Sequence, residues 1–454
     1  MSSDIQHIWG GEPMPLMPYT PCVKAGNWVF LSGQLATDFE TGITAEGGGD
    51  GRNPYLDNHL ELQSKVILDN LTSTLAAAGC DIATDVVRIY QWFTSEYPTM
   101  EEFAEGNTWP RLTITPYLRT RDLYIKPPRP ASTGMGIKEL LVADSLIEVD
   151  LLAIPGGPSV GFETPEGVPS PLAGYSPAVR RGDWIFLAGE IPVDWMGDWM
   201  SERHMGPLSG LAPEARVNPY LWYDSPIERQ TDYTLQKLEK IAAAAGASSL
   251  QDNCVKATVY LSSPNDFAGM DRVWRQWFPE NPPARVVVPY MGLGGMGSRV
   301  EIAMKLLADD ASISKETIET SDAVEPPWHE PQAVKAGDYL FFSTMIPTDE
   351  RGSLPAGVQR NPGFPHYGLP PQMEMEYLLG NISAICEAAG TSLENICKRQ
   401  CYHADFADFQ ISINEWARHF PGSKPASTTM RIGGPLQVPG AHVILDLIGY
   451  APSA

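Results

Sequence analysis

Residues 179–194 read VRRGDWIFLAGEIPVD, and this phrase decides the fold because it is repeated. The other copies are VKAGNWVFLSGQLATD at residues 23–38 and VKAGDYLFFSTMIPTD at residues 334–349. They align without a gap, and their aromatic anchors Trp28, Trp184 and Tyr339 are 156 and 155 residues apart. In each copy a Gly-Asn or Gly-Asp turn precedes a bulky apolar run, which indicates a hairpin turn and a buried strand. The sequence therefore predicts three tandem copies of one unit.

Each copy continues with the same order of elements. An asparagine-proline pair is followed by a helical stretch that ends at a glycine, as a left-handed C-cap requires; the three glycines are Gly79, Gly246 and Gly390. A second strand comes next, then a shorter helix that is clearest at residues 265–278 and 407–420. A PAR or PAS phrase and a β-rich tail complete the unit. This order predicts an α+β unit, a mixed sheet with two helices on one face.

The last strands of the units have apolar residues on both faces of the strand, as in IEVDLLAI (147–154) and VILDLIGY (443–450). The sheet face that the helices leave uncovered therefore also needs burial. Three units in one chain can bury these faces against one another, so we expect an intramolecular pseudo-trimer with closed, pseudo-threefold packing. Such a chain is compatible with a monomer in solution, and the sequence leaves further oligomerisation open.

Runs rich in Pro, Gly, Ser and acidic residues separate the units, at residues 155–171 and 309–327. We accordingly expect three domains, at residues 1–155, 156–315 and 316–454. Residues 107–128 of the first unit find no counterpart in the other two units. We interpret them as an insertion that serves as a lid or an oligomer contact.

The composition limits the classes of partner. The chain has 454 residues and a formal net charge of -23, which repels a phosphate backbone, so we do not expect nucleic acid as a partner. No apolar run is long enough to span a membrane and the start lacks a secretory pattern, so we expect no membrane association and a cytoplasmic protein. No metal-ligand spacing occurs, and we expect neither a metal nor another cofactor.

Two of the six cysteines, Cys397 and Cys401, are four residues apart. They lie in a predicted strand, where residues at this spacing share a face but are about 13 Å apart along the chain. We therefore expect ordinary buried thiols rather than a metal pair.

Several stretches of the second unit resemble the RidA (YjgF) family of enamine and imine deaminases. They are DWIFLAGEIPVD, QKLEKIAAAAG, CVKATVYLSSPNDFAGMDRVWRQWF, PENPPARVVV and RVEIAMKL. The first and third units match in outline, so the resemblance extends over most of the chain. It implies a chorismate-mutase-like fold, in which the sheets of three subunits form a central barrel with ligand clefts between neighbours. The three tandem units would take the place of these subunits.

The resemblance also implies a reaction and the residues that perform it. Members of the family hydrolyse enamines and imines derived from amino acids to a 2-keto acid and ammonia, without a cofactor. The arginine of the PAR phrase holds the substrate carboxylate, and a glutamate of the late strand activates water. Arg285 and Glu301 match these two positions in unit two. An aromatic residue near the start of the unit helps to close the cleft, and Tyr175 matches it.

Units one and three depart from the family pattern at the arginine, where they have Ser132 and Ser427. Unit three also has Ile444 in place of the glutamate and Ser343-Thr344 in place of the Ser-Gly turn. Unit two keeps both charged residues but reads AGE at 188–190 instead of SGQ. No unit is complete, although a complete set can be assembled from two units because the clefts lie between them.

Unit one keeps other positions of the pattern, namely Glu148 in the late strand and Ser32 and Gly33 in the SGQ turn. Tyr19 and His329 stand where Tyr175 stands in unit two. We therefore take the following as candidate site residues: Glu301 and Glu148 as catalytic, and Arg285, Tyr175, Tyr19, Ser32, Gly33, Ser132, Ser427 and His329 as substrate-binding.

Arginine and glutamate are residue types that suit the hydrolysis of a C=N bond in a substrate with a carboxylate. A guanidinium binds a carboxylate bidentately, and a desolvated glutamate with a raised pKa can act as acid or base when water attacks C=N. A structural alternative exists for each: Arg285 can form a salt bridge between units, and Glu301 can face solvent or pair with Arg299.

The leading hypothesis is a hydrolase or deaminase that acts on the imine, enamine or related C-N bond of a small metabolite, in one cleft lined by Arg285 and Glu301. A second is a non-catalytic small-ligand binder or scaffold with vestigial clefts. A third is a serine-based amidohydrolase of a small nitrogenous compound. In it, Ser132 or Ser427 is the nucleophile and Lys126 or Lys424 activates it.

Overall fold

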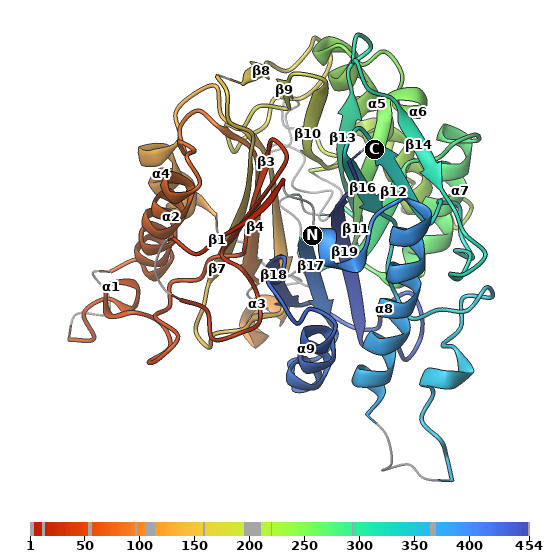
Figure 1. The fold of residues 1–454 in the computed structure, drawn as a ribbon. Coiled ribbons are helices and arrows are strands. Elements are labelled where there is room, and N and C mark those ends of the chain that lie inside the picture. Colours follow the sequence, from red (N-terminus) through yellow and green to blue (C-terminus); the bar gives the residue numbers. More distant parts are fainter. Residues whose placement is uncertain are drawn as a thin grey trace.

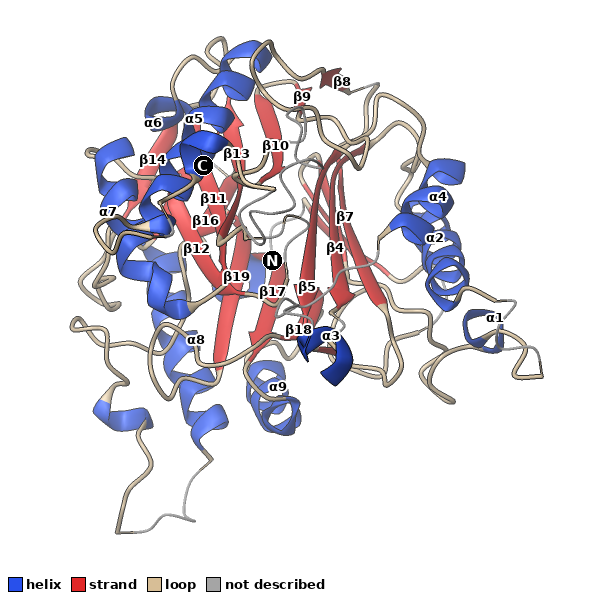
Figure 2. Cartoon of the chain, turned by 180° about the vertical axis from the view of Figure 1, so that it is seen from behind, coloured by secondary structure: helices blue, strands red, loops and turns tan. Residues whose placement is uncertain are grey.

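Three mixed β-sheets with helices packed on one side of each make up the fold, as a computed structural model shows (Figure 1). Seen from behind in Figure 2, the strands gather toward the middle and the helices lie toward the outside. The structure describes residues 4–452 except 11–13, 53–56, 96–97, 105–113, 158, 195–209, 219, 293–294, 296 and 364–368.

Unit one forms the first sheet, in the order β1-β2-β3-β7-β4-β5. Its strands are β1 (Ile5–Ile8), β2 (Cys22–Ala25), β3 (Trp28–Leu31), β4 (Val86–Thr94), β5 (Ala131–Ile137) and β7 (Ile147–Ala153). Its helices are α1 (Ala45–Gly48), α2 (His59–Ala77), α3 (Met100–Ala104) and α4 (Thr115–Tyr124).

Unit two repeats this topology, in the order β12-β11-β13-β10-β9-β8. The strands are β8 (Val160–Phe162), β9 (Ala178–Arg181), β10 (Trp184–Glu190), β11 (Cys254–Leu261), β12 (Ala284–Pro289) and β13 (Val300–Leu307). The helices are α5 (Pro226–Ala245), α6 (Leu250–Asn253) and α7 (Phe267–Trp277).

Unit three forms the third sheet, which also takes in a short strand from unit one, in the order β14-β15-β16-β19-β17-β18-β6. The strands are β14 (Lys315–Ile318), β15 (Ala333–Ala336), β16 (Tyr339–Phe342), β17 (Ile396–His403), β18 (Ala426–Arg431), β19 (Val443–Tyr450) and, from unit one, β6 (Glu139–Leu140). The helices are α8 (Pro370–Ala388) and α9 (Phe409–Arg418). The domain boundaries at 155/156 and 315/316 stay predictions.

The α+β class and the mixed sheets are confirmed. In each unit the central strand runs parallel to the strand of the PAR or PAS phrase and antiparallel to the late strand. The long helices end as predicted, because Gly79, Gly246 and Gly390 have φ of +73°, +96° and +76°, a conformation that favours glycine.

The interpretation of residues 107–128 as an insertion without counterpart is wrong for its described part. The helix α4 packs on α2, as α7 packs on α5 and α9 on α8. It is therefore the second helix of unit one. Its sequence, TPYLRTRDLY, hides this equivalence because it shares no side-chain pattern with the other two helices.

Each unit has its own core between sheet and helices, and two further cores are shared by all three sheets. In β3 the side chains alternate: Trp28 and Phe30 enter a shared core, and Val29 and Leu31 face the helices. Trp28 stacks on Tyr339, with 4.3 Å between ring centroids, and meets Trp184 edge-on at 4.8 Å. The faces that the helices leave free are therefore buried against one another. The pseudo-threefold symmetry of the pseudo-trimer stays a prediction.

A register shift recurs in the central strand of every unit, at Val86/Arg88, Cys254/Lys256 and Ile396/Lys398. Such a bulge inserts one residue and reverses which face the following side chains take. It explains why Cys397 enters a shared core while Cys401 faces the helices. The prediction that these two cysteines share a face is therefore wrong.

The residue after each bulge is a buried cation that reaches into the next unit. Arg88 of unit one donates to the carbonyl oxygen of Leu187 of unit two. Lys256 of unit two donates to that of Phe342 of unit three. Lys398 of unit three donates to that of Leu31 of unit one, at 2.7 Å. These equivalent contacts run from unit one to two, two to three and three to one.

The two lysines among these cations also form buried ion pairs between units. Lys256 lies 2.8 Å from a carboxylate oxygen of Asp446, and Lys398 lies 3.0 Å from one of Asp150. Asp150 further accepts hydrogen bonds from Thr428 and Gln400. In unit two the position of these aspartates is Ala303, so the contact between units one and two lacks this pair.

We expect Asp150→Ala to lower the free energy of unfolding by about 3–5 kcal/mol, because it leaves the buried Lys398 ammonium without its anion. Thermal and urea unfolding followed by circular dichroism measure the loss. The matched control is Asp310→Ala, which removes a 71% exposed partner of Arg180 and is expected to change stability by at most about 1 kcal/mol. Equal losses in both variants would contradict the importance assigned to the pair.

Candidate functional site

The predicted site residues are distributed over three clefts, each formed where two units meet. Each cleft is named by the unit that supplies the PAR or PAS strand, followed by the unit that supplies the turn. In cleft 3/1, the Gly33 N–H donates to the Ser427 carbonyl at 3.0 Å. In cleft 2/3, the Arg285 N–H donates to Ser343 Oγ at 3.2 Å. In cleft 1/2, β10 of unit two packs on β5 of unit one. The turn after the first buried hairpin of one unit therefore lies on the PAR or PAS strand of the unit before it.

Cleft 1/2 contains a partly open cavity of about 180 Å³. It brings together Ser132 of unit one with Tyr175 and Glu301 of unit two, three of the predicted residues. The second helix of unit one and the segment before β9 form an apolar wall. The polar lining is completed by Gln91, Glu190 and Lys237, and the wall includes Phe93, Ile114, Leu118 and Leu172.

Glu301 lies directly over Gly189, in the turn at the end of β10. A Cβ atom built on Gly189 would lie 2.0 Å from Glu301 Oε1, so no residue with a side chain fits there unless the carboxyl moves. Burial raises the pKa of Glu301 to about 8, and repulsion by Glu190 adds to the rise, while Arg88 and Lys237 lower it. At neutral pH the carboxyl is therefore mostly protonated, which is the state that can donate a proton.

The other charges of the cavity cancel. Glu190 and Lys237 are both buried and form an ion pair of 2.6 Å. On the side of unit one, Ser132 Oγ and the amide of Gln91 exchange hydrogen bonds, with Gln91 Nε2 at 2.9 Å and Oε1 at 3.2 Å. At the position where unit two has Arg285, unit one therefore has the neutral hydroxyl of Ser132, hydrogen-bonded to the neutral amide of Gln91.

Sequence reasoning missed Gln91, Glu190 and Lys237. The AGE turn was a signal for Glu190, because the other units have Gln34 and Met345 at this place. A lysine in α5 where α2 and α8 carry Asn70 and Asn381 was a signal for Lys237. No signal marked Gln91, which the pairing of β4 with β5 brings to Ser132.

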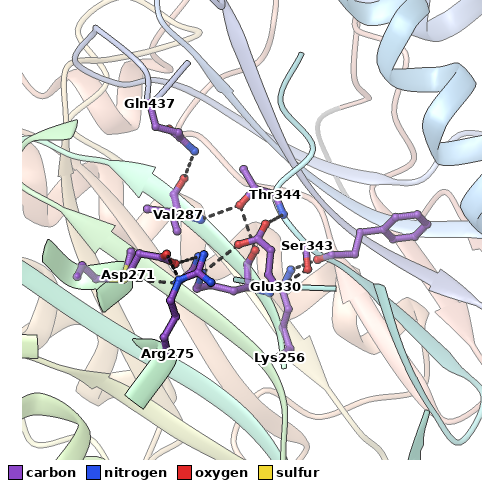
Figure 3. Close-up of polar contacts among 11 residues, drawn as sticks. Lys256, Asp271, Arg275, Val287, Glu330, Ser343, Thr344 and Gln437 are labelled. Carbon is purple, nitrogen blue, oxygen red and sulfur yellow. Dashed lines mark hydrogen bonds and ion pairs between the residues drawn. The ribbon is translucent and has the colours of Figure 1, made fainter. Parts of the chain in front are cut away.

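In cleft 2/3, Arg285 is fully buried and neutralised within the protein. Figure 3 shows the carboxylates of Asp271 and Glu330, with Thr344 next to Glu330. Arg285 Nη2 lies 2.7 Å from Asp271 and its Nε 3.0 Å from Glu330. The N–H of Thr344, at the place of the turn glycine, donates to the other oxygen of Glu330 at 3.2 Å. These bonds occupy the guanidinium that would otherwise bind a substrate carboxylate.

The expectation that Arg285 and Glu301 line one cleft is therefore corrected. Glu301 faces the strand of the preceding unit, which is unit one, whereas Arg285 lies on the strand that faces the following unit. His329 belongs with Arg285: it lines an open groove in cleft 2/3, and its Nε2 lies 2.6 Å from the Phe278 carbonyl.

Cleft 3/1 brings together Tyr19, Ser32, Gly33, Glu148 and Ser427, the remaining predicted residues. Glu148 lies over Gly33 as Glu301 lies over Gly189, with 1.8 Å between Oε1 and a Cβ built on the glycine. Burial, with a contribution from Asp150, raises its pKa to about 8. Ser32 Oγ donates to the Thr20 carbonyl and accepts from the Ser427 N–H. The cavity measures about 20 Å³.

Neither serine has the lysine that the amidohydrolase hypothesis requires. Lys126 donates to the Asp122 carbonyl and is exposed, and Lys424 donates to the Gly422 carbonyl at 3.0 Å. Ser132 is bonded to Gln91, and Ser427 Oγ accepts from Arg399. An amide and a guanidinium are poor bases, so the geometry gives this hypothesis no support.

Two absences apply to the part of the chain that the structure describes. There, no group of three or more His, Cys, Asp or Glu side chains lies in position to hold a metal ion. Likewise, none of the described helices combines the length and the apolar character needed to cross a membrane.

Comparison with known proteins finds relatives of a single unit. A RutC family protein of Pyrococcus horikoshii is 34% identical over 123 residues, covering 27% of this chain and 79% of the relative. The 3-aminoacrylate deaminase RutC of Acinetobacter baylyi is 29% identical over 139 residues, covering 31% and 90%. The 2-iminobutanoate/2-iminopropanoate deaminase of Rattus norvegicus is 31% identical over 134 residues, covering 30% and 80%.

Solved structures give similar matches. RidA from an Antarctic Psychrobacter species matches with a TM-score of 0.25 and 26% identity, over 30% of this chain and 98% of that chain. A chorismatase matches with a TM-score of 0.46 and 11% identity, over 81% of this chain and 93% of that chain.

The sequence model of one family, Endoribonuclease L-PSP, matches residues 10–155 and again residues 166–306. These two matches cover units one and two and together more than half of the chain. The chain therefore belongs to the Endoribonuclease L-PSP family, that of the RidA and RutC proteins, with the family unit repeated in tandem.

Proposed function

We propose that the protein is a cofactor-independent hydrolase that releases ammonia from the imine or enamine of a small, uncharged metabolite in cleft 1/2. The observation that carries this proposal is the carboxyl of Glu301, which is buried over Gly189 in a cavity that Ser132 and Gln91 also line. Relatives named as deaminases of 3-aminoacrylate and of 2-iminobutanoate support the reaction class.

The protonation state of Glu301 suggests its part in the reaction. As a neutral acid, with its pKa raised to about 8 by burial, it protonates the imine nitrogen or the terminal carbon of an enamine. The carboxylate that remains takes a proton from the water that attacks the C=N carbon. Return of that proton to nitrogen makes ammonia the leaving group, and the Glu301 carboxylate takes the hydroxyl proton as the carbonyl forms, so that one water is consumed and Glu301 is regenerated protonated.

The electrostatics of the cleft favour a substrate without a carboxylate. Ser132 and Gln91 are neutral, and the Lys237 ammonium is paired with Glu190 at 2.6 Å. A buried carboxylate would therefore lack a free cation, at a substantial desolvation cost. The cavity of about 180 Å³ is smaller than the pockets of roughly 300–1,000 Å³ that hold drug-sized ligands. A compact neutral molecule fits these properties best.

The alternative of a non-catalytic binder or scaffold draws support from one place. In cleft 2/3, Arg285 forms ion pairs with Asp271 and Glu330. Thr344 stands at the glycine position and Ile444 at the glutamate position of the pattern. That cleft is best explained as a structural contact. The same explanation does not extend to cleft 1/2, where the Glu301 carboxyl, Ser132 and Gln91 line one cavity.

We expect Glu301→Gln to lower kcat/KM about 10²–10⁴-fold for the release of ammonia from 2-iminopropanamide, because the amide cannot transfer the proton. Ammonia is measured with wild type and variant on freshly formed imine, with 2-iminopropionate as the charged comparison. The control is Asp446→Asn, which alters a buried carboxylate of unit three in the contact between units two and three and retains activity per folded molecule. No release by the wild type on either imine would exclude the deaminase function.

The pH dependence of activity tests the role as acid. Since the protonated form of Glu301 is the active one, kcat/KM is expected to fall as the pH rises through about 8. Initial rates between pH 5.5 and 9.5, corrected for the uncatalysed hydrolysis of the imine, measure the profile. A rate that rises through this pH would assign Glu301 the role of base instead.

The raised pKa also predicts a pH dependence of stability. A carboxyl with a higher pKa in the folded than in the unfolded state stabilises the fold below its unfolded value near 4.5, and this contribution is lost as the pH rises to about 8. Glu301→Gln removes the ionisable group. The melting temperature of the variant minus that of the wild type is therefore expected to increase from pH 5 to pH 8. A constant difference across this range would show that Glu301 has an ordinary pKa.

A further inference from the structure

Lys237 of α5 and Glu190 at the end of β10 form a buried ion pair in cleft 1/2. Lys237 Nζ lies 2.6 Å from Glu190 Oε2, and the two side chains are 5% and 4% exposed. The only other acceptor for Lys237 among the described residues is the Ile191 carbonyl oxygen, at 3.5 Å. Both members of the pair line the cavity that Glu301 and Ser132 also line. The pair is therefore part of the cavity wall.

Both members of the pair are specific to unit two. At the equivalent positions units one and three have uncharged residues, namely Asn70, Asn381, Gln34 and Met345. Units one and three nevertheless adopt the same order of strands as unit two. The fold of a unit therefore does not require a lysine and a carboxylate here, and the cavity is the feature that the pair adds to.

A buried lysine and a buried carboxyl in contact can exist in two protonation states. Attraction between the charges favours the ionic state, but burial penalises both charges. Burial also raises the pKa of Glu190, and Lys237 opposes this rise. Transfer of one proton from Lys237 to Glu190, across 2.6 Å, leaves a neutral amine, the form of lysine that is nucleophilic. Glu190 is thus positioned to act as the base that activates Lys237.

Glu301 supplies the matching acid. Its carboxyl lies over Gly189, the neighbour of Glu190 in the chain, and burial raises its pKa to about 8. The charges of Lys237 and Glu190 both act on this carboxyl, so the three groups are close together. A C=N group in the cavity can then be protonated on nitrogen by Glu301 while its carbon meets the Lys237 amine.

We propose that Lys237 is the nucleophile of cleft 1/2 and forms a Schiff base with the carbon of the imine substrate. The inference rests on the proposed deaminase function and adds a covalent intermediate to it. The Lys237 amine adds to the C=N carbon after Glu301 has protonated the nitrogen. The Glu301 carboxylate then moves a proton from the lysine nitrogen to the substrate nitrogen. Ammonia leaves as the C=N bond to Lys237 forms.

Water then attacks this Schiff base instead of the free imine. The Glu301 carboxylate takes a proton from the water, and the Glu190 carboxyl gives its proton to the lysine nitrogen. The C–N bond to Lys237 breaks, and the amine takes the hydroxyl proton as the carbonyl forms. One imine and one water thus become one carbonyl compound and one ammonia. The Lys237–Glu190 ion pair and the neutral Glu301 carboxyl are restored.

Reductive trapping tests directly for the Schiff base. The full chain is incubated with cyanoborohydride and pyruvamide, the carbonyl product expected from 2-iminopropanamide, and adducts are located by peptide mass spectrometry. We expect a reduced adduct on Lys237 at about tenfold or more the occupancy of Lys240, an exposed lysine of the same helix. Glu190→Gln, which lacks the base, should lower the occupancy. Equal occupancy of the two lysines, or no adduct on Lys237, would overturn the inference.

Substitution of the lysine separates covalent catalysis from the role of an ion pair. Lys237→Arg keeps a cation beside Glu190 but cannot form a Schiff base, and should lower kcat for ammonia release from 2-iminopropanamide on the order of 100-fold or more. Lys240→Met is the control and should retain the wild-type rate, with circular dichroism as the check of folding. Near-normal turnover by Lys237→Arg would refute the covalent role and leave the deaminase function intact. Absence of ammonia release by the wild type would contradict the deaminase function, and trapping with pyruvamide would still decide whether Lys237 forms a Schiff base.

Discussion

The burial of the sheet face that the helices leave free is the constraint on which the rest of the structure depends. Trp28 and Phe30 on one face of β3 would meet water in an isolated unit, whereas Val29 and Leu31 are covered by α2 and its neighbours. Burial of apolar surface stabilises the fold by about 25 cal/mol per Å², so leaving these aromatic side chains in water would be unfavourable. The three free faces therefore pack together, and the bulges add a cation from each unit to a carbonyl of the next. Clefts between units are a consequence of this packing.

The three clefts of the chain differ in their residues. The turn and the late strand correspond in each cleft: a glutamate stands where Gly33 or Gly189 leaves room for its carboxyl, and Ile444 stands where the turn residue is Thr344. The reason is steric, since the glutamate oxygen lies where a Cβ of the turn residue would be. In cleft 2/3, where this carboxyl is absent, the Arg285–Glu330 ion pair forms a contact between units two and three.

The sequence was sufficient to predict the repeated unit, its order of strands and the glycine C-caps, because each depends on local pattern alone. It was insufficient for α4, whose side-chain pattern is unlike α7 and α9, and for the faces of Cys397 and Cys401, because a bulge needs the partner strand to be seen. The grouping of Tyr175, Glu301 and Ser132 in one cavity depends on which unit neighbours which. That order is set by tertiary packing, and so the pairing of Arg285 with Glu301 could not be judged from positions in the chain.

Arg285 and Arg399 also show why a single position is a poor guide to the charge of a cleft. Neighbouring strands lie about 4.8 Å apart, so a long guanidinium side chain from either strand reaches the equivalent tryptophan. Arg285 lies over Trp274, and Arg399 of β17 lies over Trp416. The residue opposite must then be small, and it is Ala257 beside Arg285 and Ser427 beside Arg399. In unit one the pair is Ile89 and Ser132, which supplies no cation, and Gln91 fills the polar role. The charge that a cleft offers a ligand is therefore a property of the cross-strand pair and of its counter-ions, and the PAR or PAS phrase contains only half of that pair.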